Sequence, residues 1–361
     1  MKKNTNTKTS VFVAMSGGVD SSLSACLLKE QGYNVTGVFM KNWSGDNYGI
    51  QSGCPWEKDQ HDAEDVCKTL EIPFRTFNFE KEYHSKVISY FFSEFRAGRT
   101  PNPDVICNKE IKFGLFLEKA LEMGADMIAT GHYAQVRFNN TINEFELLRG
   151  KDPAKDQSYF LCELNQAKLS KTLFPIGGML KTEVRILAEK QKIPVSNKPD
   201  SQGICFIGEI NVGKFLRANI KIHKGEIIDI DNKQLVGIHD GIEFYTIGQR
   251  EGLNLGGSKE PYFVVSKDKI KNIIYVAMGK TNPLLFSLQV HFGELNWINS
   301  QAKINMQNLV ASIRYRGPQI AGDLDLNNNF FNFDEPQRAI AQGQKIVIYE
   351  NDILRASATI I

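Results

Sequence analysis

The stretch FVAMSGGVDSSLSACLLKEQG, residues 12–32, joins an apolar strand to a helix through a short turn rich in glycine and serine. The strand signal is VFVAM at 11–15, after which Val19, Leu23 and Cys26 recur at helical spacing. A strand followed at once by a helix is the typical opening unit of a parallel α/β sheet.

The alternation of strand and helix signals continues to about residue 135. Further strands are expected at 35–40, 74–79 and 126–130, and further helices at about 63–70, 83–95 and 109–123. This order predicts a doubly wound parallel sheet flanked by helices. We assign it to a catalytic domain spanning 1–213.

Beyond residue 214 helical spacing is mostly lost, and short strand-like stretches alternate with turns rich in Gly, Asn and Lys. We expect a small, mostly β central module over 214–282. The strand signals that follow Asn282 and Pro283 suit a small antiparallel β-barrel over 283–361.

The composition is that of a folded, soluble protein. The chain has 361 residues, of which 42% are hydrophobic and 23% charged, and its net charge of +2 neither requires nor excludes a nucleic acid partner. The polar start MKKNTNTKTS and the absence of a long apolar run predict a cytoplasmic protein with no membrane partner. Six irregularly spaced cysteines indicate reduced thiols.

The turn at 16–22 has the features of an anion site. Gly17 and Gly18 allow successive amide groups to point into one concavity at the start of a helix. Asp20 could hold a magnesium ion or orient the loop. Hydroxyl donors accompany them: Ser16, Ser21 and Ser22. The alternative is an ordinary glycine-rich turn with a serine cap and no ligand.

SGGVDSS directly after the first strand resembles the PP-loop of the ATP pyrophosphatases, which adenylate a substrate oxygen and release pyrophosphate. The resemblance implies ATP, accompanied by Mg²⁺, with its phosphates over this turn. The contacts that it implies are Ala14, Met15, Ser16, Gly17, Gly18, Val19, Asp20 and Ser21.

A first candidate thiol lies in GRTPNPDVICNKEIKFG, residues 98–114. Two prolines stiffen an extended approach, and a helix is expected to begin close to Cys107. The helix dipole and Lys109 would then favour a reactive thiolate. Asp104 could exchange protons with a bound base. The alternative is a buried cysteine, with Asp104 as a helix cap.

A second candidate thiol, Cys205, follows a loop of Pro, Asp, Ser, Gln and Gly in NKPDSQGICFIGE, residues 197–209. A loop thiol can carry a transferable sulfur atom, although an apolar cysteine at the start of ICFI is the alternative. Cys107 and Cys205 could also meet as a transient disulfide. Such a pairing is what sulfur transfer needs.

The other cysteines suggest packing rather than chemistry. Cys26 and Cys67 lie on apolar helix faces, and Cys162 lies in the apolar stretch YFLCEL. Cys54, His61 and Cys67 could be imagined as zinc ligands, but His61 and Cys67 face poorly together on one helix.

Seven motifs in order resemble the tRNA-specific 2-thiouridylases of the PP-loop superfamily. They are SGGVDSS, GVFMKNW (37–43), GRTPNPDVICNKEIKFG, ATGHYA (129–134), KDQSYFL (155–161), DSQGICFIGE (200–209) and YTIGQREGLNLGG (245–257). The resemblance implies an ATP-dependent sulfurtransferase that modifies the wobble uridine, position 34, of the tRNAs for Lys, Glu and Gln. ATP would adenylate the 2-oxygen, and a cysteine persulfide would then deliver sulfur as AMP leaves.

The same resemblance implies roles for individual residues. Cys205 would carry the persulfide, and Cys107 would be the nucleophile that releases its sulfur, directly or by forming a disulfide with Cys205. Asp104 would serve as general acid/base. The main chain at Met40 would hold adenine, and Gly131 would let the backbone approach the nucleotide.

Contacts with tRNA are also implied. Asn102, Pro103 and Asp104 would meet the flipped-out target base. Further contacts are expected at Lys155, Asp156, Gln157, Arg314 and Tyr315. The basic residues Lys214, Arg217, Lys221 and Lys224 of the central module could follow phosphates or form a solvated face. The other expected partner is a persulfide donor, either a cysteine desulfurase or a relay protein, and the chain is expected to be a monomer.

Two rival functions would each explain only part of this set of motifs. An amidating synthetase of the superfamily would keep the ATP loop but would not require both Cys107 and Cys205. A non-catalytic RNA-binding protein would not need a phosphate-ready loop together with two loop cysteines.

Overall fold

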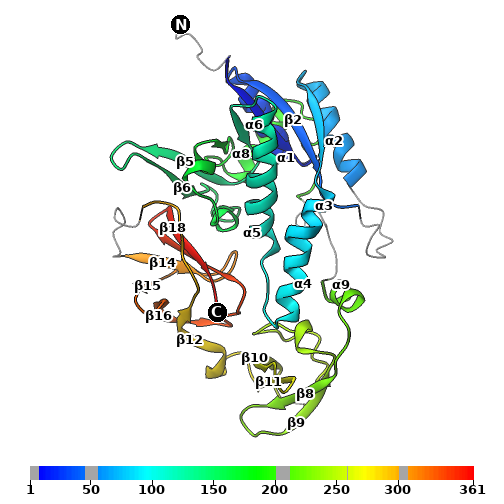
Figure 1. The fold of residues 1–361 in the computed structure, drawn as a ribbon, viewed down its shortest axis with the longest axis vertical. Coiled ribbons are helices and arrows are strands. Elements are labelled where there is room, and N and C mark those ends of the chain that lie inside the picture. Colours follow the sequence, from blue (N-terminus) through cyan, green and yellow to red (C-terminus); the bar gives the residue numbers. More distant parts are fainter. Residues whose placement is uncertain (1–7, 45–55, 201–211, 258, 301–307) are drawn as a thin grey trace.

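The computed structural model describes residues 8–44, 56–200, 212–257, 259–300 and 308–361 (Figure 1). Its first unit is a five-stranded sheet in the order β3-β2-β1-β4-β7, in which every pairing is parallel. The strands are β1 (Ser10–Met15), β2 (Asn34–Lys41), β3 (Phe74–Asn78), β4 (Met127–Ala129) and β7 (Thr172–Leu173). The predicted parallel sheet is confirmed.

Successive side chains of a strand point to opposite faces of the sheet, and in these strands the side chains on both faces are mostly apolar. Helices therefore cover both faces. One face packs on α1 (Val19–Glu30), α2 (Trp56–Thr69) and α8 (Lys181–Lys190). The other packs on two longer helical segments. Phe39 of β2 faces the first layer, whereas Val38 and Met40 belong to the core of the second.

The two longer segments each contain a π-helical stretch. The first runs through α3 (Glu80–Tyr83), η3 (His84–Ile88) and α4 (Ser89–Arg96). The second runs through α5 (Pro103–Cys107), η4 (Asn108–Leu115) and α6 (Phe116–Glu122).

The prediction that the second segment begins close to Cys107 is wrong. Pro103 is its first residue, and the Asn102 side chain caps it by accepting a hydrogen bond from the Val105 amide at 3.2 Å. Proline is favoured at a first helical position because the amide that it lacks would have no partner there. Asn102, rather than Asp104, is therefore the cap.

A hairpin inside the first unit leaves its sheet and joins the C-terminal barrel. Its strands are β5 (Ala134–Asn139) and β6 (Glu144–Arg149), followed by η5 (Ser158–Leu161) and α7 (Gln166–Leu169). Leu148 and Leu147 of β6 pair with Ile353 and Leu354 of the last strand. This exchange was not predicted.

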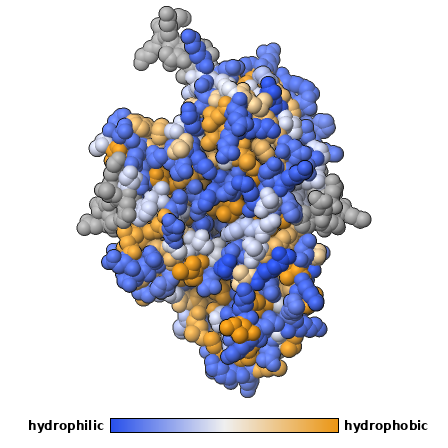
Figure 2. All heavy atoms as spheres, in the orientation of Figure 1, coloured by the Kyte–Doolittle hydropathy of each residue, from blue (hydrophilic) through white to orange (hydrophobic). Residues whose placement is uncertain are grey.

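The central module is a four-stranded mixed sheet in the order β10-β11-β8-β9, at the lower end of Figure 1. Its elements are α9 (Val212–Asn219), β8 (Gly225–Asp229), β9 (Leu235–His239), η6 (Ile242–Phe244), β10 (Tyr262–Asp268) and β11 (Ile273–Met278). Figure 2 shows hydrophobic atoms among the hydrophilic ones at the lower end of the molecule, where the central module lies. Within the ranges described, no helix is long and apolar enough to cross a membrane.

The C-terminal unit is an antiparallel barrel, as predicted. Its elements are η7 (Pro283–Leu285), β12 (Phe286–His291), β13 (Asn296–Trp297), β14 (Leu309–Ser312), β15 (Ile320–Asp325), β16 (Phe330–Arg338), β17 (Lys345–Glu350) and β18 (Ile353–Thr359). An antiparallel bridge from Phe292 to Ile360 joins the chain just after β12 to the chain just after β18, and the β5–β6 hairpin lies beyond β18 in the same sheet.

The barrel also holds the segment that leads into α5. The Gln342 carbonyl accepts a hydrogen bond from the Thr100 amide at 2.8 Å, and the Gln344 amide group donates to the carbonyls of Thr100 and Pro101. Nearby, the Glu163 carboxylate, on a side chain that is 9% exposed, binds the ammonium groups of Lys109 and Lys345. The barrel thereby fixes the start of the helix that carries Cys107.

Candidate active site

The crevice for a ligand lies at the carboxyl edge of the parallel sheet. The strand order reverses between β1 and β4, and in open α/β sheets ligands bind outside the carboxyl ends of the strands at such a point. The turn at 16–18 follows β1, and the turn at 130–133 follows β4. Met40, at the end of the neighbouring strand β2, is within reach of the same edge.

The turn after β1 is shaped by Gly17. Its φ is +71°, and a Cβ added there would lie 2.3 Å from the Asp59 carbonyl oxygen of α2. The first amides of α1, from Val19 onward, have no carbonyl one turn earlier in the helix, so they are available to an anion. This geometry fits the phosphates of a nucleotide.

The serines divide between two roles, which corrects the expectation that all three offer donors to the anion. The Ser21 and Ser22 hydroxyls donate to the Gly18 carbonyl at 3.1 and 2.8 Å, and the Ser21 hydroxyl accepts from the Ser16 amide at 3.1 Å. Both residues are buried, whereas Ser16 is exposed. Ser21 and Ser22 therefore hold the turn, and Ser16 faces outward.

Asp20 orients the loop in this structure. Its carboxylate accepts hydrogen bonds from Lys181 Nζ at 2.8 and 2.9 Å and from the Tyr133 hydroxyl at 2.8 Å. Burial, together with the Asp20 charge, raises the pKa of Tyr133, so the phenol stays protonated and donates. In the part of the chain that is described, no three His, Cys, Asp or Glu side chains cluster as metal ligands.

Gly131 brings the turn after β4 against α1. A Cβ at this position would lie 2.7 Å from the Ser21 nitrogen and 2.8 Å from the Asp20 carbonyl carbon. The glycine is thus needed for contact within the protein, besides any approach to a nucleotide.

Lysine and arginine side chains surround the loop. Lys155 among them was expected to contact tRNA, whereas Lys181, Arg185 and Lys198 were not singled out from the sequence. Asp200 forms ion pairs with Lys155, Lys181 and Arg185, each at an N···O distance of 2.7 Å. Lys198 binds Asp59 and Asp62, and it donates to the Gly17 carbonyl at 3.0 Å. The four aspartates and four cations of this cluster balance, so the loop is not repulsive to a polyanion.

Cys107 is fully buried at the end of α5, among the core residues of the second layer. The Lys109 ammonium binds Glu163 at 3.0 Å, and Cys107 is the fifth residue of its helix. Because the helix dipole acts mainly on the first turn, neither of the two predicted sources of thiolate stabilisation is supported. Asp104, one turn earlier, is partly exposed.

Some of the remaining cysteines lie in the described part of the chain and others do not. Cys205 and Cys54 lie outside the described residues. Cys26 and Cys162 are buried, as is Cys67, whose pKa is raised by burial to about 12. His61, on the same helix as Cys67, is exposed.

Comparisons with known proteins cover nearly the whole chain. Residues 9–209 match a family described as tRNA methyl transferase HUP domain, 213–278 its PRC-barrel domain, and 288–360 an aminomethyltransferase beta-barrel domain. The tRNA-specific 2-thiouridylase MnmA of Alkaliphilus oremlandii is 47% identical over 98% of this chain and 97% of that protein. The chain belongs to the tRNA-specific 2-thiouridylase family. Proteins of the same name from Geobacillus thermodenitrificans and Streptococcus mutans are each 47% identical, over 98% and 96% of this chain and 95% and 94% of theirs.

In this 2-thiouridylase, the loop at 155–157 is bonded to Tyr133, beside the ATP-type turn. Asp156 faces into its own loop, where it accepts from the Gly150 and Ser158 amides at 2.9 and 3.1 Å, and burial raises its pKa. Gln157 exchanges hydrogen bonds with the main chain of Tyr133, which binds Asp20. Two of the three expected tRNA contacts therefore hold the loop in place.

The second expected tRNA contact of this 2-thiouridylase adjoins the first. Arg314 and Tyr315 lie in a turn, because β14 ends at Ser312. The Tyr315 ring packs on Phe160, with centroids 4.2 Å apart. The exposed Arg316 guanidinium lies 5.1 Å from the Tyr315 ring centroid. Segments 155–161 and 314–316 are thus in contact through Phe160 and Tyr315.

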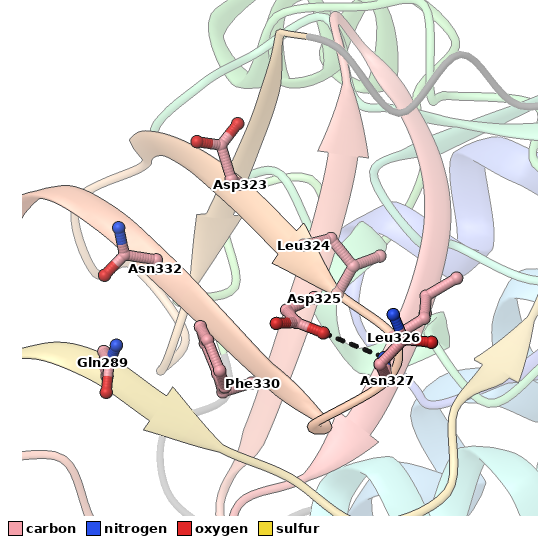
Figure 3. A pocket seen from close by; sticks show the side chains of 8 residues that line it. All are labelled: Gln289, Asp323, Leu324, Asp325, Leu326, Asn327, Phe330 and Asn332. Atoms are coloured by element: carbon pink, nitrogen blue, oxygen red, sulfur yellow. Dashed lines mark hydrogen bonds between the residues drawn. The ribbon is translucent and has the colours of Figure 1, made fainter.

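A hollow elsewhere on the barrel has a different character. Figure 3 shows it at β12, β15 and β16, with Asp323 and Asp325 among its lining residues. Its volume is about 660 Å³. Asp325 accepts from the Asn327 amide at 2.9 Å. None of the site residues predicted for a 2-thiouridylase lines this acidic hollow.

The Asp200 cluster gives a pH prediction. Although partial burial acts to raise it, hydrogen bonds from Lys155 and Lys181 bring the pKa of Asp200 to about 2, below the unfolded value of about 3.9. The stabilisation is fully present above about pH 4 and is lost as the pH falls through about 2. Asp200→Asn is therefore expected to lower Tm at pH 7 by a few degrees, a difference that shrinks below pH 4.

Thermal unfolding of the two proteins from pH 7 to pH 3 measures this. Asp323→Asn, an exposed position on the barrel, is the control and is expected to leave Tm unchanged. A Tm difference for Asp200→Asn that grows on acidification would contradict the assigned pKa direction.

Proposed function

We propose that this protein converts the wobble uridine of the tRNAs for Lys, Glu and Gln to 2-thiouridine, using ATP and a cysteine persulfide. Membership of the 2-thiouridylase family supports the reaction. The observation that carries the site is that Met40, beside the ATP-type turn, and Cys107 belong to one core cluster on the same face of the sheet. The nucleotide crevice and the thiol therefore adjoin the same layer.

In the first step, the uracil 2-oxygen attacks the α-phosphorus of ATP and pyrophosphate leaves. The amides at the start of α1 stabilise the negative charge of the phosphates. Mg²⁺ bound with the triphosphate would neutralise part of that charge, and Asp20 is the carboxylate on the first turn of α1 that could ligate it.

In the second step, the terminal sulfur of a Cys205 persulfide attacks C2 and AMP leaves with the former 2-oxygen. The Cys107 thiolate then attacks Cys205 Sγ, and the electron pair of the broken S–S bond passes to the sulfur on C2. This yields 2-thiouridine and a Cys107–Cys205 disulfide, which a cellular thiol must reduce. Asp104 accepts or returns the proton of the base.

The surface that binds tRNA would include the segments at 155–161 and 314–316, with Asn102, Pro103 and Asp104 at the target base. A persulfide-carrying desulfurase or relay protein would load Cys205. We place the reaction in the cytoplasm, where tRNA is available, and infer a monomeric enzyme.

Purified protein is expected to form 2-thiouridine in an unmodified tRNA transcript when ATP, Mg²⁺ and a persulfide donor are all present. Nucleoside mass spectrometry measures the product, and release of pyrophosphate should depend on a uridine at position 34. Retention of tRNA on a filter without thiolation or pyrophosphate release would favour the non-catalytic RNA-binding alternative.

A further inference from the structure

Asn42, the residue directly after β2, has a buried side-chain amide without a hydrogen-bond partner in the described structure. The residue is 2% exposed, and neither Oδ1 nor Nδ2 has a partner among the described residues. Most buried polar side chains are hydrogen-bonded because an unmade bond opposes folding. An amide with both its donor and its acceptor unused is therefore a candidate ligand group.

The position of Asn42 relates it to Cys107. Its neighbours Met40 and Trp43 belong to the same core cluster as Val105 and Cys107, rather than to the cluster of α1. The Trp43 ring also packs edge-on against Phe215 of α9, at 6.1 Å between centroids. The chain at Asn42 is thus enclosed on the Cys107 side of the sheet, at the carboxyl edge where a substrate would enter.

We propose that the Asn42 amide binds the N3–H and O4 edge of the target uracil. This inference rests on the proposed function, because in that reaction C2 and its oxygen must face the phosphate and the sulfur donor. The remaining polar edge of uracil presents one acceptor, O4, beside one donor, N3–H. A carboxamide is complementary in the initial complex, since Nδ2 donates to O4 and Oδ1 accepts from N3–H, and both unused groups are then satisfied. Adenylation of the 2-oxygen passes the N3 proton to Asp104, so only the bond from Nδ2 to O4 persists in the intermediate.

Adenine is the competing ligand, because a carboxamide can also pair with its N6 and N7 atoms. Two arguments favour uracil. Trp43, the residue after Asn42, belongs to the same core cluster as Cys107. The resemblance assigns adenine to the main chain at Met40 rather than to a side chain. A role in binding ATP is therefore treated as an outcome that overturns the proposal.

Replacing Asn42 with leucine, which has a similar volume, separates a ligand group from a structural one. Asn42→Leu removes an unsatisfied buried amide, so Tm of the ligand-free protein should stay the same or rise. The affinity for full-length tRNA with uridine at position 34 should fall about 10-fold, the effect of a good bidentate contact. The affinity for ATP should not change.

A matched control is Asn299→Leu. Asn299 is also 2% exposed, but its amide is fully bonded to Glu144, the Phe145 carbonyl and Arg355. This variant should lower Tm.

Methylation of the base tests the assigned atoms. A tRNA with 3-methyluridine at position 34 lacks the N3–H donor, so the wild type should bind it about 10-fold more weakly than the uridine form, whereas Asn42→Leu should distinguish the two much less. Equal discrimination by both proteins, a lower Tm for Asn42→Leu, or a selective loss of ATP affinity would each overturn the proposal. If the wild type binds with this sensitivity but forms no 2-thiouridine, the proposed function fails and the base contact stands.

Discussion

The Cys107→Ala protein is expected to release pyrophosphate in a tRNA-dependent manner while forming 2-thiouridine at a rate lower by about 10³-fold or more. Adenylation requires the turn at 16–22 and the target base, neither of which this substitution removes. After the persulfide attacks C2, the transferred sulfur is still bonded to Cys205 Sγ. A thiolate must attack Cys205 Sγ to break that bond. Pyrophosphate release and nucleoside mass spectrometry, measured on one reaction, separate the two steps.

Cys26→Ala is the matched control, because Cys26 is also a buried thiol but lies on the core face of α1. It is expected to retain both activities. Cys205→Ala should behave as Cys107→Ala does. Thiolation that survives in either of these two variants would exclude the proposed sulfur transfer through Cys107 and Cys205.

Gly17→Ala is expected to destabilise the protein and to weaken ATP binding at least about 10-fold. Alanine at this position would adopt a left-handed conformation, with its Cβ 2.3 Å from the Asp59 carbonyl oxygen, so the turn and the start of α2 must separate. The strain and overpacking together are worth about 2–4 kcal/mol. Thermal unfolding and ATP titration of the full chain measure the two effects.

The adjacent glycine supplies the control for this prediction. Gly18 has φ of −101°, and a Cβ there would lie 3.4 Å from the Ser16 hydroxyl oxygen, which is an ordinary contact. Gly18→Ala should therefore cost less than about 1 kcal/mol. Equal effects of the two substitutions would show that the close approach to α2 is not what requires glycine.

The fold was predictable where local periodicity is strong. Strands β1 and β2 lie within one residue of their expected bounds, and α1 contains the apolar positions Val19, Leu23 and Cys26 that predicted it. Strand β15 was missed because Gly322, Asp323 and Asp325 weaken its strand propensity. The β5–β6 hairpin alternates between Ala134 and Phe138, yet nothing local indicates that its partner is the C-terminal barrel.

The site was predictable in the same uneven way. The sequence placed Gly17, Gly18 and Asp20 at the anion-binding turn, and the start of α1 has the expected geometry. It did not indicate Lys181, because the ion pair with Asp20 joins positions 161 residues apart. It also suggested Lys109 as a neighbour of the Cys107 thiolate on sequence proximity alone, whereas the fold directs that ammonium to Glu163.

The pairing of β6 with β18 has a consequence for how the protein is made. Leu148 is synthesised long before its partner Ile353. Domains usually fold in order as they leave the ribosome, but this hairpin cannot complete its pairing until β18 has been synthesised. The segment before α5 must likewise wait for Gln342 and Gln344, which hold it. A nascent chain therefore acquires its braced Cys107 helix only after the barrel strands have been made, so a chain cut short in the barrel should accumulate without thiolation activity.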